Sequence, residues 1–351
     1  MRLVSNTYSS FRGLLDAVHE FSNINLVLGN NGDGKTSLLE AIYVSLLGTP
    51  LNSFTKAGRE LSRNNKGFFS SESKAVDHRG NTTIYKFCTT SSGSKHLTDD
   101  TKTTIREAYL RTPVCLIGSN IEKIASESPD YRRKLIDRSA FHVEPEHAES
   151  YRKLQKAIKQ RNRSLKNGDT INVVKTWDKT ISKEGEKITE NRKSFIKELQ
   201  AELCLIEKEI SKREINIEFR CGWGEGKLSD YLEKNIKRDI AAKRTLGGPH
   251  RADMLVTLDG MSAKEFSSKG EEKQMSLTVS FGISKLIEKK TGALPILLID
   301  ELESGLDEGA LVRISEYIKK LKNQSLITAL NHHKIKEMLS AKTIQPKQYN
   351  C

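Results

Sequence analysis

The segment GNNGDGKTS, residues 29–37, constrains the fold of this chain more than any other. It follows INLVLG, a short apolar run typical of a buried strand, and it opens KTSLLEAIYVSLLG, whose apolar residues recur at helical spacing up to Gly48. A loop of the pattern G-x-x-x-x-G-K-[ST] between a strand and a helix cradles phosphate groups with its backbone N–H groups. The sequence therefore predicts a nucleotide-binding loop in an α/β layer; an ordinary glycine turn is the alternative.

Each residue type in such a loop has a definite task. Lys35 would bridge the β- and γ-phosphate oxygens, and the hydroxyl of Thr36 would bind Mg²⁺. Asp33 is an unusual acid beside a phosphate site, and we expect its side chain to face outward. The residues predicted to contact the nucleotide are Gly29, Asn30, Asn31, Gly32, Asp33, Gly34, Lys35, Thr36 and Ser37. The predicted cofactors are ATP and Mg²⁺.

A second motif, LPILLIDELESGLD at 294–307, supplies the carboxylates that a nucleotide–metal site needs. A buried strand that ends in Asp300 would bring this carboxylate to the edge of the sheet beside the glycine loop. Asp300 would hold Mg²⁺ through water, and Glu301 would polarise the attacking water, so Glu301 and Lys35 are the predicted catalytic residues. The alternative is a strand that merely ends in surface acids. Most of the chain separates Lys35 from Asp300, which predicts an inserted second lobe.

The basic balance of the chain points to a polyanionic partner. Lys and Arg number 58 against 45 Asp and Glu, a net charge of +13, which favours nucleic acid or a membrane surface over neutral partners. From about 130 to 240 the sequence is highly charged and helical. Residues 151–166 place Tyr151, Leu154, Ile158 and Leu165 on one face of a helix, and a second stripe runs through 181–213. We expect these two helices to pack antiparallel.

The opposite face of 151–166 is basic, and the segment contains no acid. We expect it to contact nucleic-acid phosphates without reading base sequence, although a solvated face would carry the same pattern. The candidate DNA-binding residues are Arg152, Lys156, Lys159, Arg163 and Lys166.

The cysteines and the apolar runs indicate the cellular compartment of the protein. Five scattered cysteines form no C-x-x-C pair, which indicates reduced thiols and no zinc site. The N-terminus lacks the apolar core of a signal peptide, and the run LPILLI is too short to span a bilayer. We therefore expect a cytoplasmic protein without a membrane partner.

Taken together, the glycine loop, SKGE at 268–271 and LLIDELESGLD resemble the head of an ATP-binding-cassette (ABC) ATPase. Within that superfamily the chain resembles the RecF family of bacterial recombination-repair ATPases. The segments that carry this resemblance are FRGL at 11–14, SPDYRRKLIDRSAFHVEPE at 128–146, QRNRSLK at 160–166 and GGPHRADMLVTLDG at 247–260. The implied fold is an α/β ABC-type P-loop ATPase head with an inserted, mostly helical second lobe. We expect the head over 1–120 and 241–351 and the lobe over 121–240. After residue 245 the runs DMLVTLDG, ALPILLID and QSLITALN predict strands that close the same α/β layer.

The resemblance implies that ATP is bound between two protomers. Ser268 and Gly270 would touch the γ-phosphate on the facing protomer, and Asp307 would reach across the same interface. ATP would then favour a homodimer. The implied partners are duplex DNA or single-strand–duplex junctions and RecO- and RecR-like mediators, and the implied task is to help load RecA during DNA damage repair, replication restart and the SOS response.

The chain also departs from the family pattern. Glu271 stands where the signature has Gln, and Thr49 and Asn52 stand where arginines are common. Ser119 and Asn120 follow the strand VCLIG where a Gln is usual, and the sensing histidine would be His332 or His333. These departures predict a slow, DNA-stimulated, regulatory ATPase. An ATP-binding DNA scaffold with negligible hydrolysis and the ATPase of a transporter are the alternatives.

Some charged residues have two interpretations. Arg132, Arg133 and Asp137 would form either a salt-bridged hinge between the lobes or a DNA- or ATP-linked site. His250 and Arg251 would cap the strand that follows them or contribute to function.

Overall fold

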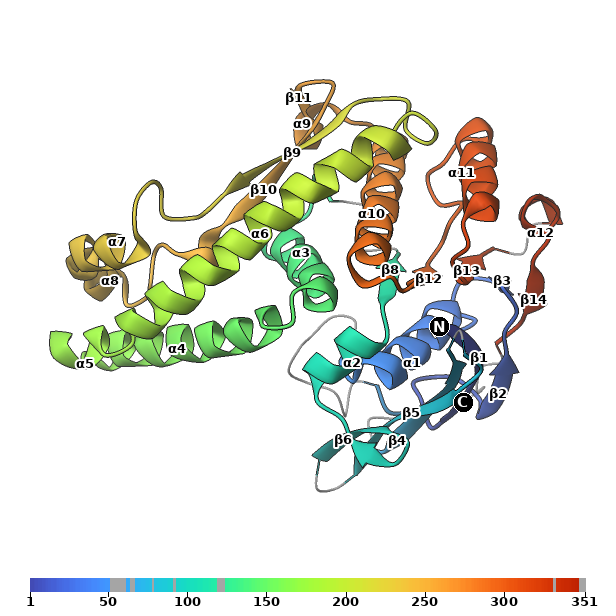
Figure 1. Ribbon diagram of the computed structural model, residues 1–351, viewed down its shortest axis with the longest axis horizontal. Helices are drawn as coiled ribbons and strands as arrows, with labels where there is room; N and C mark the ends of the chain where they lie inside the picture. Colours follow the sequence, from blue (N-terminus) through green and yellow to red (C-terminus); the bar gives the residue numbers. More distant parts are fainter. Residues whose placement is uncertain are drawn as a thin grey trace. The chain divides into compact units, whose positions relative to one another are not determined.

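The computed structural model describes residues 1–50, 61–63, 67–77, 79–90, 93–118, 124–330 and 333–346. The chain forms two compact units, each built from separate segments (Figure 1). The first unit comprises 1–122, 208–212 and 269–351, and the second comprises 123–207 and 213–268. The second unit is thus an insertion between the two halves of the first.

A parallel sheet in the first unit joins the two ends of the chain. Its strand order is β14-β3-β13-β12-β8. The strands are β3 (Ile24–Leu28), β8 (Val114–Ile117), β12 (Ile296–Ile299), β13 (Ser325–Ala329) and β14 (Lys342–Ile344). Strands β12 and β13 are buried along their whole length, as expected for strands covered on both faces. The predicted strands at 24–28, 114–117, 296–299 and 325–329 are confirmed.

A six-stranded antiparallel sheet completes the first unit, with strand order β2-β1-β4-β5-β6-β7. Its strands are β1 (Arg2–Ser9), β2 (Ala17–Glu20), β4 (Phe69–Val76), β5 (Thr82–Thr90), β6 (Gly93–Thr98) and β7 (Thr101–Lys102). Helix α1 (Lys35–Leu47) packs against β4, β5 and β13, and its residues from Leu38 to Leu47 are all buried. Glu40 on this helix pairs with Arg12 of the FRGL segment at 2.5 Å, which satisfies its buried charge.

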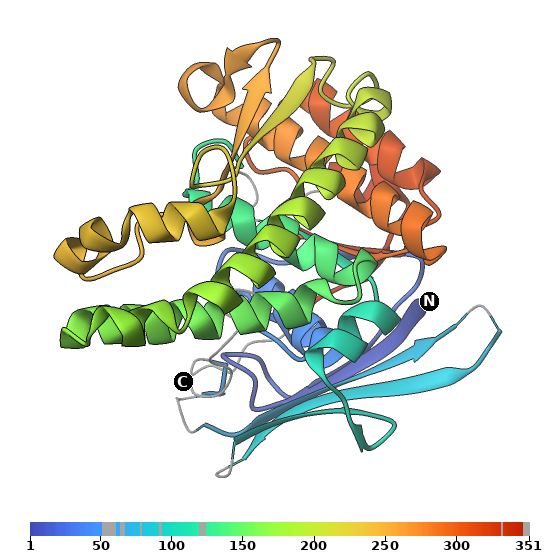
Figure 2. The same cartoon turned by 60° about the vertical axis from the view of Figure 1, so that its left-hand side comes forward.

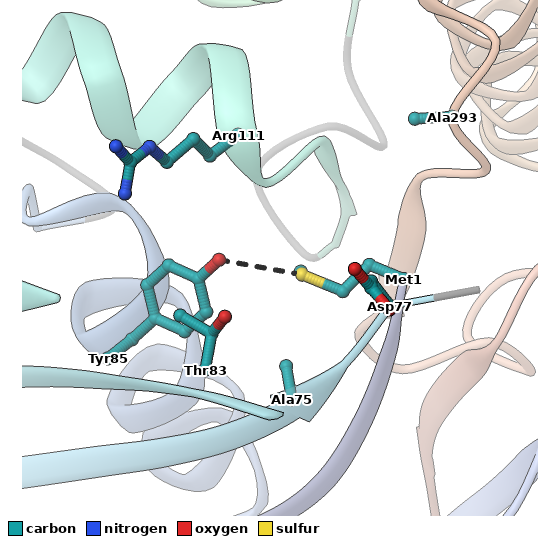
Figure 3. A pocket seen from close by; sticks show the side chains of 7 residues that line it. All are labelled: Met1, Ala75, Asp77, Thr83, Tyr85, Arg111 and Ala293. Atoms are coloured by element: carbon teal, nitrogen blue, oxygen red, sulfur yellow. Dashed lines mark hydrogen bonds between the residues drawn. The ribbon is translucent and has the colours of Figure 1, made fainter. Parts of the chain in front are cut away.

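The described part of the first unit contains four more helices: α2 (Ile105–Arg111), α10 (Lys269–Thr291), α11 (Glu308–Lys320) and α12 (His333–Leu339). Figure 3 shows a hollow of about 280 Å³ in this unit, where the hydroxyl of Tyr85 donates to the sulfur of Met1 at 3.6 Å. No residue of the glycine loop lines the hollow, so it is separate from the predicted nucleotide site.

The second unit contains seven helices and a small sheet within its described residues. The helices are α3 (Pro129–Val143), α4 (His147–Asn167), α5 (Ile171–Lys175), α6 (Asp178–Ile206), α7 (Leu228–Lys234), α8 (Ile236–Ala242) and α9 (Ala263–Phe266). Helices α4 and α6 lie side by side and run in opposite directions (Figures 1 and 2), which confirms the predicted antiparallel pair. Leu154 and Ile158 of α4 share a core with Ile181 and Ile188 of α6.

One strand is not where the sequence placed it. The run DMLVTL, β10 (Asp253–Leu258), was expected to close the α/β layer; instead it pairs with β9 (Ile215–Arg220) and β11 (Met261–Ser262) in an antiparallel sheet. Its residues alternate between half-buried and buried, because only one face of this sheet is covered. This pairing keeps 241–268 in the second unit, which therefore ends at 268 rather than 240.

Among the described residues, no helix combines the length and apolarity needed to cross a membrane. The described cysteines, Cys88, Cys115, Cys204 and Cys221, are free thiols. Cys351 lies outside the described residues.

Candidate nucleotide-binding site

The glycine loop connects the end of β3 to the start of α1. Gly32 and Gly34 have φ of 95° and 83°, the left-handed region that glycine enters without steric cost. Gly34 is the N-cap of α1 and makes no side-chain cap, so the first N–H groups of the helix are left to a ligand. The loop therefore has the backbone geometry and the positive helix end that an anion requires.

Lys35 is folded back over the loop. Its ammonium donates to the carbonyl oxygens of Gly29 at 2.8 Å and Asn30 at 2.9 Å, and the residue is only 6% exposed. These two acceptors are neutral, and no ion pair of Lys35 occurs among the described residues. A phosphate group would provide the compensating charge.

The predicted outward orientation of Asp33 is wrong. Its carboxylate turns back into the loop and accepts the N–H of Asn30 at 2.6 Å, while its own N–H donates to the carbonyl oxygen of Asn30 at 3.2 Å. The turn leaves an N–H at Asn30 that a short acidic side chain can reach. Gly29 makes room for it, because a Cβ there would lie 2.9 Å from Cβ and Oδ2 of Asp33.

The structure brings Asp300 to the start of α1. Thr36 Oγ1 donates to the two carboxylate oxygens of Asp300 at 2.9 and 3.1 Å, across 264 positions of sequence. The parallel register explains this, because β13 pairs with both β3 and β12 and the carboxyl ends of the three strands meet at one edge. Gly118 permits the approach, since a Cβ there would lie 2.8 Å from Cβ of Asp300.

These oxygens fit a magnesium ion. A hydroxyl and a carboxylate are hard ligands, and Mg²⁺ usually takes only one or two protein ligands beside phosphate oxygens and water. Within the described residues no group of three or more His, Cys, Asp or Glu side chains is arranged to hold a metal. Thr36 and Asp300 are therefore suited to a metal that arrives with a nucleotide.

Glu301 follows Asp300 in a strained backbone conformation, with φ of 49°. Its N–H donates to Thr328 Oγ1 at 2.7 Å, and its carbonyl oxygen accepts from the ammonium of Lys273 at 3.0 Å. The hydroxyl of Thr328 in turn donates to Asp300 Oδ1 at 2.6 Å. One buried hydroxyl thus contacts both acidic residues.

Thr328 and Lys273 have positions in the site that the sequence alone did not reveal. Thr328 is a polar residue near the end of the apolar strand SLITA, and Lys273 is a buried lysine within α10. Those two irregularities are the only signals that could have identified them.

Two of the residues predicted to act across a dimer interface, Gly270 and Asp307, have local roles in this chain. A Cβ at Gly270 would lie 3.0 Å from the carbonyl oxygen of Gly305, so the start of α10 is closely packed. Asp307 caps α11, accepting the N–H of Ala310 at 2.8 Å. Ser268 is exposed and is the last residue of the second unit.

The candidate DNA-binding residues share one exposed face of α4. Leu154, Ile158 and Leu165 on the opposite face are buried, as the helical pattern predicted. None of the five basic residues forms an ion pair with another residue in the described part of the chain. The exposed basic residues are Arg152, Lys156, Lys159, Arg163 and Lys166.

Arg132, Arg133 and Asp137 make contacts within the second unit. Arg132 is held by both carboxylate oxygens of Asp253 at 2.8 and 2.9 Å, and Arg133 donates to the carbonyl oxygen of Ala252. These partners of Arg132 and Arg133 lie inside the second unit, so the salt bridge and the hydrogen bond stay within that unit and do not show the predicted hinge between the lobes.

Asp137 joins three helices. It receives two hydrogen bonds from Arg192 at 2.8 and 2.7 Å and one from His147 at 3.0 Å. Burial alone would raise the pKa of Asp137, but the Arg192 charge and these hydrogen bonds outweigh it and lower the pKa to about 2.

His250 precedes β10 in a short 3₁₀ turn, Pro249–Arg251. Its Nε2 lies 3.1 Å from the carbonyl oxygen of Thr245. Burial lowers the pKa of His250 to about 4, so the ring is neutral at physiological pH.

Several predicted positions lie outside the described residues: Asn52, Ser119, Asn120 and His332. His333 begins α12, but its side chain is outside the description. Thr49 is buried, and its hydroxyl is 3.5 Å from that of Tyr109.

Comparisons with known proteins agree along most of the chain. A protein-family model described as an AAA domain matches residues 7–348. The DNA replication and repair protein RecF of Pseudoalteromonas translucida (strain TAC 125) is 31% identical over 340 residues, which cover 93% of this chain and 90% of that protein. The protein of the same name from Coxiella burnetii (strain CbuK_Q154) is 26% identical over 347 residues, covering 93% and 92%.

Solved structures show the same architecture. The recombination mediator protein RecF with ATP, of the RecFOR pathway, matches with a TM-score of 0.86 at 21% identity, covering 99% of this chain and 95% of that one. An SMC head bound to the C-terminal winged-helix domain of ScpA matches with a TM-score of 0.58 at 15% identity, covering 99% and 95%. The fold is that of an ABC-type ATPase head with an inserted second lobe.

Proposed function

The chain belongs to the RecF family of DNA replication and repair proteins, and from this premise we propose that it is an ATP-dependent DNA-binding protein of recombinational repair and replication restart. The observation that carries the proposal is the hydrogen bonding of Thr36 to Asp300, which joins the glycine loop to the acidic strand end. A phosphate cradle and a metal-binding carboxylate in contact are the two parts that a nucleotide–Mg²⁺ site requires.

The roles of the residues follow from this contact. The loop N–H groups, from Gly29 to Ser37, bind the phosphates, and Lys35 exchanges its carbonyl partners for β- and γ-phosphate oxygens. Thr36 and Asp300 would hold Mg²⁺, and the metal would neutralise charge on the phosphates. Glu301 would orient the attacking water. We propose an ATPase that is slow and regulatory and that DNA stimulates.

We further propose that ATP joins two copies of the chain. Ser268 and Gly270 of one protomer would contact the γ-phosphate bound by the other, and Asp307 would add a contact across the interface. A ligand that binds the dimer better than the monomer must favour the dimer by the same free energy. Hydrolysis would then release the two chains.

DNA is the proposed partner of the α4 face. Its five exposed cations form no ion pair among the described residues, which suits a phosphate backbone, so binding should be salt-sensitive and largely independent of sequence. The proposed substrates are duplex DNA or single-strand–duplex junctions. The proposed protein partners are RecO- and RecR-like mediators, with which the chain would help to load RecA. The proposed compartment is the cytoplasm.

The experiment compares wild type with Lys35→Met by sedimentation, with and without ATP and duplex DNA. We expect ATP to shift the wild type to a dimer and to raise its DNA affinity, and to do neither for Lys35→Met, because that variant loses the phosphate-binding ammonium. Circular dichroism of both proteins checks that the variant is folded. A wild type whose association and DNA affinity do not respond to ATP would contradict the proposal.

A DNA-binding scaffold with negligible hydrolysis is the second candidate, and Glu271 favours it. This acid lies half-buried in the first turn of α10, where its charge would oppose a triphosphate. Phosphate release by wild type and Glu301→Gln in the presence of DNA separates the two. A rate that falls at least tenfold in the variant supports the ATPase, and equal, negligible rates support the scaffold.

A further inference from the structure

A second basic segment is bonded to the side of α4. Lys243 and Arg244 are exposed in the turn that follows α8. The next residue, Thr245, donates its N–H and its hydroxyl to Oδ1 of Asn162 on α4, at 2.7 and 2.9 Å. The turn is therefore fixed to α4 at one defined position.

That position borders the basic face of α4. At about 100° per residue, Asn162 falls between the buried face and the basic residues. Arg163 is its neighbour in sequence, and Lys166 lies one turn further on the same side of the helix. Lys243 and Arg244 therefore extend the basic face of α4 rather than forming a separate patch.

A buried arginine holds the two segments together. Arg161 is fully buried and donates to Asp178 of α6 at 2.7 Å, to Asp239 of α8 at 2.6 Å and to the hydroxyl of Thr245 at 2.8 Å. Asp239, which would oppose a phosphate backbone if it were exposed, is neutralised in this cluster. The cluster fixes α8 to α4 and removes its acid from the surface.

The backbone at Lys243 is unusual for a side chain of this size. Lys243 is the C-cap of α8 with φ of 53°, a position where glycine is the common residue. A lysine that occupies a conformation better suited to glycine is consistent with a role for its side chain.

We propose that Lys243 and Arg244 are phosphate-contacting residues, and that they form with the α4 face one continuous surface for the backbone of duplex DNA. The inference rests on the proposed function. DNA is favoured over an acidic protein because Asp239, beside the junction of the two segments, is buried against Arg161, which leaves a row of exposed cations that suits the regular charge of a duplex.

The experiment uses the full chain and fluorescein-labelled duplex DNA, with anisotropy measured across a salt series. One variant carries Lys243→Gly with Arg244→Ala. Its control carries Lys237→Ala with Arg238→Ala, which removes the same charges from α8. These control residues lie about 200° and 100° around the helix from Asp239, away from α4.

The slope of log K against log salt is negative, and we expect it to become less negative by about two for the first variant and to remain at the wild-type value for the control. The Lys243→Gly backbone is less strained, so the variant should melt no lower than wild type. Equal changes in both variants, or no change in either, would overturn the inference. So would an equal loss of affinity for poly-L-glutamate, which would indicate an acidic protein partner.

A variant with Lys156→Ala and Lys159→Ala keeps this test separate from the proposed function. If it weakens DNA binding while Lys243→Gly/Arg244→Ala does not, the inference fails and the proposed function stands. If the wild type itself shows no salt-dependent affinity for the duplex, the proposed function fails as well.

Discussion

Thr328 is the residue on which the two acids of the site depend most directly. Its single hydroxyl donates to Asp300 and accepts from the N–H of Glu301. We predict that Thr328→Val, which keeps the shape and removes the hydroxyl, weakens Mg²⁺–ATP binding by about tenfold, because a hydrogen bond to a charged group contributes about 1.5–3 kcal/mol. Isothermal titration with ATP measures this affinity, with and without Mg²⁺.

Thr328→Ser is the matched control, since it keeps the hydroxyl and should retain most of the affinity. The loss in Thr328→Val should be larger with Mg²⁺ than without it, because Asp300 acts through the metal. An equal loss under both conditions would mean that the residue only supports the fold.

The sequence predicted the parts of the site that depend on local chemistry. The residues 29–37 follow from a continuous pattern, and Asp300 follows from an acid at the end of an apolar strand. Thr328 and Lys273 escaped prediction because their roles arise from contacts across the sheet and between α10 and the strand end. The orientation of Asp33 was predicted wrongly because charge was considered without the free N–H of Asn30.

Helices α3, α4 and α6 share one buried ion cluster, in which Asp137 contacts Arg192 and His147. We predict that Asp137→Asn destabilises the protein by about 3–5 kcal/mol, because it leaves the Arg192 charge buried without its partner. Urea unfolding measures the change. Glu190→Gln, an exposed acid on α6, is the control and should change stability by less than about 0.5 kcal/mol.

The pair of Asp137 and Arg192 should also make the stability of the protein depend on pH. The pKa of Asp137 is about 2 in the folded protein, below its ordinary 3.8, so the unfolded chain takes up this proton first. The stabilisation is complete above about pH 5 and is lost as the pH falls toward 2. The Asn variant should lack this component of acid unfolding; an unchanged acid transition would argue against a lowered pKa.

The elements were predicted more reliably than their assembly. Each strand of the parallel sheet except β14 was recognised from a short apolar run, and α1 and α4 from their periodicity. Strand β10 was recognised but assigned to the wrong sheet, because the sequence of a strand does not determine which strand it pairs with. Its alternating burial in the structure shows that one face is left uncovered, which the mostly apolar run DMLVTL does not reveal.

At the scale of the whole molecule, the long separation between Lys35 and Asp300 predicted the insertion. The pairing of β9 with β10 extends that insertion to residue 268. The boundary therefore falls between Ser268 and Gly270, the two residues proposed to contact the partner's nucleotide. The sequence could not locate it, because the boundary depends on long-range strand pairing.

That arrangement gives a prediction for the dimer. If each nucleotide site combines the glycine loop of one protomer with Ser268 of the other, then Lys35→Met and Ser268→Arg disable different halves of the same site. Each variant alone should fail to dimerise with ATP, because both of its sites are defective. A mixture should regain association, since one of the two sites in every mixed dimer is intact. With random pairing in a two-fold dimer, about a quarter of all sites would then be intact. Sedimentation of the two variants, alone and mixed, measures this, and a mixture that stays monomeric with ATP would place both residues on the same side of the site.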